Sequence, residues 1–101
     1  MSKIIIEKEN TQELKTLVKG ALENEIKIIN IGIKKTQENL QKLEDKYKID
    51  SETFYSKYSS GDMGDKTEYI KWAGEIETLK RLQQNLMELS EAEVCYTQGN
   101  K

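Results

Sequence analysis

The chain contains no histidine and no proline, and its only cysteine is Cys95. Without histidine there can be no Ser-His-Asp or Cys-His catalytic set, and no Glu-x-x-His iron motif of the kind found in helical bundles. A single cysteine excludes a disulfide within these residues, which suits a reducing compartment. The absence of proline removes the residue that most strongly interrupts helices. The sequence therefore predicts an uninterrupted helical protein that is not an enzyme.

Long apolar runs are also absent, because no stretch approaches the length needed to span a bilayer. The three isoleucines after Lys3 are too few for a signal-peptide core, so we expect a cytoplasmic protein with no membrane segment. The 16 basic and 18 acidic residues leave a net charge of −2. Since neither sign dominates, no electrostatic attraction toward nucleic acid or anionic lipid is expected.

The apolar residues that are present follow a helical pattern. Their gaps alternate between four and three residues, the spacing that keeps side chains on one side of a helix packed against a partner. The main stripe consists of Leu22, Ile26, Ile29, Ile33, Thr36, Leu40, Leu43 and Tyr47. The composition and length predict one coiled-coil-like domain over residues 1–101.

The first helix is predicted from Thr11 to Lys48. Asn10 can cap it, with Glu13 reaching back toward the cap. Gly20 and Gly32 each cost about 1 kcal/mol relative to alanine inside a helix, and either is a candidate for a bend or for a place where another backbone comes close.

A short helix is predicted from Ser51 to Tyr58. Asp50 can cap its start, and Gly61 is the usual residue at a helix end. Asp65 with Glu68 then forms a D-x-x-E start for the next helix.

The last helix is predicted from Lys66 to Glu91, antiparallel to the first. Its stripe consists of Tyr69, Trp72, Ala73, Ile76, Leu79, Leu82, Leu86 and Leu89. Val94 to Tyr96 are β-prone, and Lys3 to Glu7 could form a short strand. Residues 1–9 and 93–101 are expected to be flexible or ordered by a partner. The predicted fold is an all-α hairpin of two long helices with a short helix at the turn.

The first helix has more apolar surface than this hairpin can cover. At about 57 Å it overhangs a last helix of about 39 Å. A helix that is apolar on more than one side is usually covered on more than one side, so we predict a second protein surface. The predicted partner-binding residues are Ile4, Ile6, Leu14, Leu17, Val18, Ile28 and Ile31. The alternative is that the first helix breaks and folds back, or that the termini cover these residues.

Metal and nucleic-acid sites have weak signals. Gly61 to Asp65 resembles a calcium loop only in part, because Met63 and Gly64 interrupt the oxygen ligands, so no metal or cofactor is expected. A strand followed by a helix occurs in ribbon–helix–helix DNA binders, but Glu7 beside phosphate argues against that alternative. Cys95 is expected to be a buried or half-exposed apolar residue rather than a nucleophile.

The central half of the chain carries recognisable motifs. They are Gly32-Ile33-x-x-Thr36, Leu40, Leu43-Glu44, Lys46-Tyr47, Ser51-x-x-Phe54-Tyr55-x-x-Tyr58, Gly64-Asp65, Tyr69-x-x-Trp72-x-Gly74-Glu75 and Leu79. Over Ile31 to Leu89 the chain resembles small all-helical prokaryotic proteins that look like the antitoxins of type II toxin–antitoxin pairs. The resemblance implies no catalytic residues, and it implies that Phe54, Tyr58 and Trp72 lock the helices together.

An antitoxin neutralises its toxin by laying an apolar helix or strand over the toxin surface. The resemblance therefore implies a protein partner, a small toxin encoded nearby. The alternative is a homo-oligomeric helical scaffold, a homodimer or larger, in which the same residues face a symmetry mate.

Overall fold

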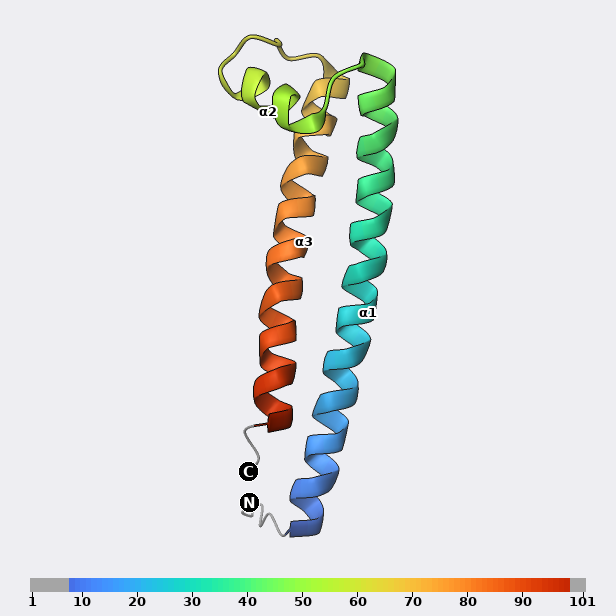
Figure 1. Ribbon diagram of the computed structural model, residues 1–101, viewed down its shortest axis with the longest axis vertical. Helices are drawn as coiled ribbons and strands as arrows, with labels where there is room; N and C mark the ends of the chain where they lie inside the picture. Colours follow the sequence, from blue (N-terminus) through green and yellow to red (C-terminus); the bar gives the residue numbers. More distant parts are fainter. Residues whose placement is uncertain (1–7, 99–101) are drawn as a thin grey trace, which may run out of the picture.

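Two long helices and one short helix make up the part of the chain that the computed structural model describes, residues 8–98. They are α1 (Lys8–Tyr47), α2 (Ser51–Ser59) and α3 (Thr67–Gln98). Helices α1 and α3 run antiparallel side by side, and α2 lies at the end where they are joined (Figure 1). The predicted all-α hairpin with a short turn helix is confirmed. The predicted strand from Lys3 to Glu7 lies outside the described residues.

The two apolar stripes predicted from the sequence face each other. On α1, Ile29, Thr36 and Leu40 are buried, and on α3 Trp72 and Ile76 are buried. Side chains at three- and four-residue steps fall on one face of a helix, so each long helix buries one stripe against the other.

Helix α1 is continuous through both of its glycines. The alternative in which the first helix breaks and folds back is therefore wrong. Gly32 faces α3, where a Cβ atom would lie 3.4 Å from Cδ1 of Leu82, and Gly20 has no such neighbour within 4 Å.

Two predicted helix caps and one predicted helix end are wrong. Asn10 lies inside α1 rather than capping it. Helix α3 begins at Thr67, within one residue of the predicted start, but the Glu68 carboxylate binds α1 instead of completing a capping box with Asp65. The β-prone patch from Val94 to Tyr96 is helical, because α3 continues to Gln98. The strong helix formers Glu91, Ala92 and Glu93 precede this patch, and no glycine or proline interrupts it.

Both turns close in the same way. At the end of α1, Lys48 has φ +57°, and the amide of Ile49 donates to the carbonyl of Glu44 at 3.3 Å. At the end of α2, Gly61 has φ +88°, and the amide of Asp62 donates to the carbonyl of Lys57 at 2.9 Å. This is the Schellman arrangement, with its left-handed residue supplied by the expected glycine in one turn and by a lysine in the other.

The start of α2 follows the sequence prediction. Asp50 precedes the helix, and its Oδ1 accepts a hydrogen bond from the amide of Thr53 at 2.7 Å. The Glu44 carboxylate accepts another from the amide of Ser51 at 2.7 Å. Two of the amides that a helix start leaves without partners are thus satisfied, one of them by α1.

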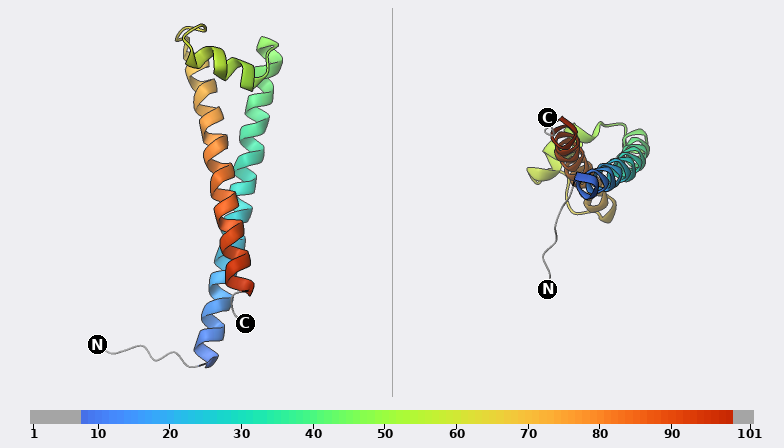
Figure 2. Two further views of the ribbon diagram at one scale, coloured as in Figure 1. Left: turned by 60° about the vertical axis from the view of Figure 1, so that its left-hand side comes forward. Right: turned by 90° about the horizontal axis from the view of Figure 1, so that it is seen from below.

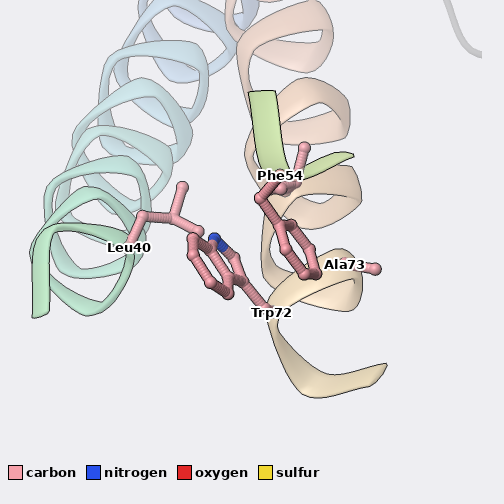
Figure 3. Packing of buried hydrophobic residues seen from close by; sticks show 5 residues of the cluster. Leu40, Phe54, Trp72 and Ala73 are labelled. Carbon is pink, nitrogen blue, oxygen red and sulfur yellow. The ribbon is translucent and has the colours of Figure 1, made fainter. Parts of the chain in front are cut away.

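The densest packing lies at the turn, where α2 meets the long helices. Phe54 of α2 and Trp72 of α3 are wholly buried, with ring centroids 3.9 Å apart and planes within 4° of parallel. Leu40 of α1 lies on the other side of the indole (Figure 3). The indole Nε1 donates to Oγ of Ser51 at 2.9 Å. The residues predicted to lock the helices are Phe54, Tyr58 and Trp72. Tyr58 also stacks on Phe54, with ring centroids 5.5 Å apart, so all three lie in the core where the helices meet.

The other half of the hairpin has a thinner core. Helices α1 and α3 diverge toward the end that α2 bridges (Figure 2), because the large rings fill the space between them there. Away from this end, Ile29 is the one apolar side chain among those described that is fully buried. The molecule measures 61 × 27 × 20 Å with a radius of gyration of 20.3 Å. A compact chain of this length would have about 13 Å. Long sides of both helices thus remain on the surface.

Candidate protein-interaction surface

A second apolar stripe runs along α1 on the side away from α3. We call it the outer stripe: Leu14, Leu17, Ala21, Asn24, Ile28 and Ile31. Its gaps also alternate between three and four residues. At about 100° per residue, Ile28 and Ile31 lie roughly 160° around the helix from Ile26 and Ile29, which face α3. The two stripes therefore lie on nearly opposite faces of one rigid helix.

The large members of the outer stripe are open to solvent. The exposed fraction is 70% for Leu17, 63% for Ile31, 52% for Ile28 and 49% for Leu14, against 6% for the neighbouring Ile29. Isolated exposed apolar residues are normal on protein surfaces. Apolar residues gathered on one line of one helix form a patch, and such patches mark interaction sites.

The structure separates the predicted partner-binding residues into three groups. Leu14, Leu17, Ile28 and Ile31 share the outer face of α1 and are exposed, as expected. Val18 is half-buried and lies off this stripe, toward α3. Ile4 and Ile6 lie outside the described residues.

The overhang of α1 is shorter than the sequence suggested. Gly32 lies opposite Leu82, and Nδ2 of Asn39 donates to Glu75 at 3.2 Å. This antiparallel register places the end of α3 level with about residue 16 of α1. Only the first turns of α1 therefore extend past α3 (Figure 1), and Leu22, the first residue of the main stripe, is half-buried.

Three exposed apolar residues on α3 were not among the predicted site residues. Ile70, Met87 and Val94 are about half exposed. In the sequence, Ile70 and Met87 fall between members of the α3 stripe, and Val94 lies beyond its last member, Leu89. Ile70 is far from the other two along the helix, so these residues do not form a line comparable to the outer stripe.

The strongest polar contacts lie at the turn, away from the outer stripe. Nζ of Lys46 lies 2.8 Å from Glu68 Oε1, and the Tyr47 hydroxyl donates to the same carboxylate. The hydrogen bond from Lys46 lowers the pKa of Glu68 and raises that of Lys46. At the α2 cap, the hydrogen bond from the Thr53 amide lowers the pKa of Asp50. These groups stabilise the turn by joining α1 to α3 and by capping α2.

A shallow groove lies beside α2, next to the aromatic core. It is lined by Leu40, Ser51, Glu52, Tyr55, Ile76, Leu79, Lys80 and Gln83. The Tyr55 hydroxyl donates to Glu77 at 2.9 Å, which raises the pKa of Tyr55, and Nζ of Lys80 lies 4.7 Å from the centroid of the Tyr55 ring. These contacts tie α2 to α3, and we assign them a structural role.

Other site classes find little support in the described part of the chain. It holds no cluster of three or more His, Cys, Asp or Glu side chains placed to bind a metal ion. None of its helices combines the length and apolar character needed to cross a membrane. Cys95 is free and exposed, whereas the sequence suggested a buried or half-exposed position.

The carboxylates at the turn make stability depend on pH. Because folding lowers the pKa of Glu68 and Asp50, their contribution is present above their unfolded pKa values and is lost as pH falls through the folded values. We expect the urea midpoint to fall between about pH 5 and pH 3. Glu68→Gln should flatten part of this fall, whereas Glu91→Gln, on the exposed end of α3, should leave it unchanged. If the urea midpoint of Glu68→Gln falls with pH as steeply as that of the parent, this role for Glu68 is contradicted.

No family model matches the chain, and neither a search of curated proteins nor a search of solved structures finds a match. Its function therefore has to be argued from its own surfaces.

Proposed function

We propose that this is a non-enzymatic protein-interaction protein that binds another polypeptide along the outer stripe of α1. The observation that carries this is a line of large apolar side chains, each about half exposed or more, on a continuous helix. Full burial of a leucine or isoleucine is worth about 1.5–3 kcal/mol, so covering Leu14, Leu17, Ile28 and Ile31 could supply roughly 1 kcal/mol each. A rigid helix offers this surface without the entropic cost of ordering it.

The biological role we favour is antitoxin-like neutralisation of a small toxin encoded nearby. The resemblance over Ile31 to Leu89 supports it, and most of the outer stripe lies before that stretch. Leu40, Phe54 and Trp72, which belong to the resemblance, pack the turn. This arrangement leaves the N-terminal half of α1 available for a partner, in the helix-in-groove mode.

The second candidate is a homo-oligomeric helical scaffold. Isologous contacts require a surface that is complementary to itself under a twofold rotation. The outer stripe has this property, since its large residues lie at both ends and its smaller residues Ala21 and Asn24 lie in the middle.

The test of the proposed function uses the variant Leu17→Glu/Ile31→Glu. The chain is co-expressed with the product of the neighbouring gene, and co-purification and rescue of growth are measured. We expect both to be lost in the variant, while helix content by circular dichroism stays near that of the parent because both side chains are exposed. Ile70→Glu, a similar change at a half-exposed site on α3, is the matched control.

Two results would count against the proposal. If the neighbouring product never binds the parent chain, the antitoxin role is wrong. If Leu17→Glu/Ile31→Glu unfolds the protein, the outer stripe belongs to the core and is not an interface.

A further inference from the structure

We infer that the outer stripe packs against the outer stripe of a second copy of this chain, with the two α1 helices antiparallel about a twofold axis between residues 22 and 23. The inference rests on the proposed function, in that it takes the outer stripe to be an interface. It develops the homo-oligomeric candidate, because a second copy and a toxin would compete for the same residues of the outer stripe. It goes further by naming the partner and the orientation of the two helices.

The order of residues along the outer stripe is symmetric about this axis. Antiparallel pairing there sets Leu14 against Ile31 of the second copy, and Leu17 against Ile28 of the second copy. Ala21 then lies against Asn24 of the second copy. Each large side chain thus meets a large side chain of the second copy, and the smaller residues Ala21 and Asn24 meet at the centre. The outer stripe of each copy therefore covers the whole outer stripe of the other.

The charges beside the stripe favour the antiparallel orientation. Glu13 and Lys34 are exposed and lie on the same edge of the outer stripe. In the antiparallel pair, Glu13 faces Lys34 of the second copy, and symmetry repeats this ion pair. In a parallel pair Glu13 would face Val18 and Lys34 would face Asn39. Neither charged residue would then meet a residue of opposite charge. Charges at the edge of a coiled-coil contact set the choice of partner orientation.

The centre of the stripe is suited to a close approach of two helices. Gly20 has no atom within 4 Å of the place a Cβ would occupy, and no contact among residues 8–98 explains a glycine at this exposed place in a long helix. Ala21 beside it is also small. A lone Asn24 among apolar neighbours fits a packed helix pair, in which one buried asparagine fixes register and orientation.

The available surface fits a small, reversible dimer interface. The register overlaps about residues 8–37 of both copies, a contact roughly 45 Å long and 10 Å wide. The two copies together would contribute about 900 Å², just under the ~1,000 Å² floor for a stable specific interface and in the size range of weaker, transient ones. Helix α3 covers the opposite face of α1, and α2 lies beyond residue 47, so neither obstructs the second copy (Figure 2).

The first experiment measures the mass of the purified full chain in solution by light scattering and sedimentation equilibrium. We expect a species of twice 11.7 kDa. Leu17→Glu/Ile28→Glu should weaken the association at least a hundredfold, and Ile70→Glu/Met87→Glu, with the same charge change on α3, should leave it unchanged. A parent chain that stays monomeric at about 100 μM would overturn the inference.

The second experiment tests the orientation by cross-linking in a Cys95→Ser background. Glu13→Cys and Lys34→Cys are prepared separately and mixed before a short thiol cross-linker is added. The mixture should form cross-linked dimers, whereas each variant alone should not, because identical residues lie about 30 Å apart along antiparallel helices. Cross-linking of Glu13→Cys with itself, and not with Lys34→Cys, would show a parallel pair and overturn the inference.

A charge exchange gives an independent check. Glu13→Lys should raise the dissociation constant of the dimer by about three- to tenfold. The new lysine would face Lys34 of the other copy, and this repulsion would occur at both symmetry-related positions. Adding Lys34→Glu should restore the parent affinity. If the double variant Glu13→Lys/Lys34→Glu dimerises no more tightly than Glu13→Lys alone, the proposed pairing is contradicted.

The results also separate this inference from the proposed function. A monomeric chain that loses its neighbour-encoded partner on Leu17→Glu/Ile31→Glu would overturn the inference and leave the proposed function standing. An antiparallel dimer that ignores the neighbouring product would support the inference and contradict the antitoxin role.

Discussion

Replacing Trp72 by alanine is expected to destabilise the fold by about 3–5 kcal/mol, enough to unfold many domains of this size. The indole is wholly buried and stacks on Phe54, with Leu40 on its other side. Its Nε1 donates to Oγ of Ser51, the first residue of α2. The substitution therefore opens a cavity where all three helices meet and leaves the Ser51 hydroxyl without this donor.

The effect of the Trp72 substitution is measured by urea unfolding, with circular dichroism as the signal that reports the folded fraction. Trp72→Phe keeps an aromatic ring but loses the Nε1 hydrogen bond, so its midpoint should lie between those of the parent and Trp72→Ala. Ile70→Ala, two residues away and half exposed, should shift the free energy of unfolding by less than about 1 kcal/mol. Equal effects of Trp72→Ala and Ile70→Ala would contradict the central role of the indole.

Replacing Phe54 by alanine is the second change expected to have a large effect, about 3–4 kcal/mol. Phe54 is the buried residue of α2, and its ring also lies 5.5 Å from that of Tyr58 and 5.7 Å from that of Tyr69. Without it, α2 loses its main apolar contact with α3. A short helix with no packed face is marginal in water, so α2 should loosen before the long helices separate.

Trp72 provides a direct measurement for Phe54→Ala, because it is the only tryptophan. Removing the ring that covers one face of the indole should shift its fluorescence emission to longer wavelength in the folded state. Ser56→Ala, on the exposed side of α2, should change neither the emission nor the urea midpoint appreciably. Unchanged emission in Phe54→Ala would mean that α2 does not shield the indole in solution.

These two changes also separate folding from binding. The aromatic core lies at the turn, whereas the outer stripe lies along the N-terminal half of α1 on the far side from α3. Substitutions at Trp72 or Phe54 should therefore reduce the amount of folded protein. Glutamate at Leu17 should reduce association of protein that remains folded.

Local patterning was sufficient to predict the main architecture. The alternating three- and four-residue gaps marked the buried stripes, Asp50 and Gly61 marked the ends of α2, and the exposure of Leu17 and Ile31 followed from their positions off the main stripe. Each of these features depends on helix geometry over a few turns, which the order of residues specifies directly.

What the sequence alone could not determine depends on contacts between distant residues. The register of α3 against α1 buries part of Val18 and Leu22 and shortens the overhang. The same register brings Glu68 to Lys46, so its carboxylate is not available to cap α3. The stacking of Phe54 on Trp72 is likewise set by packing between helices, which no local periodicity encodes.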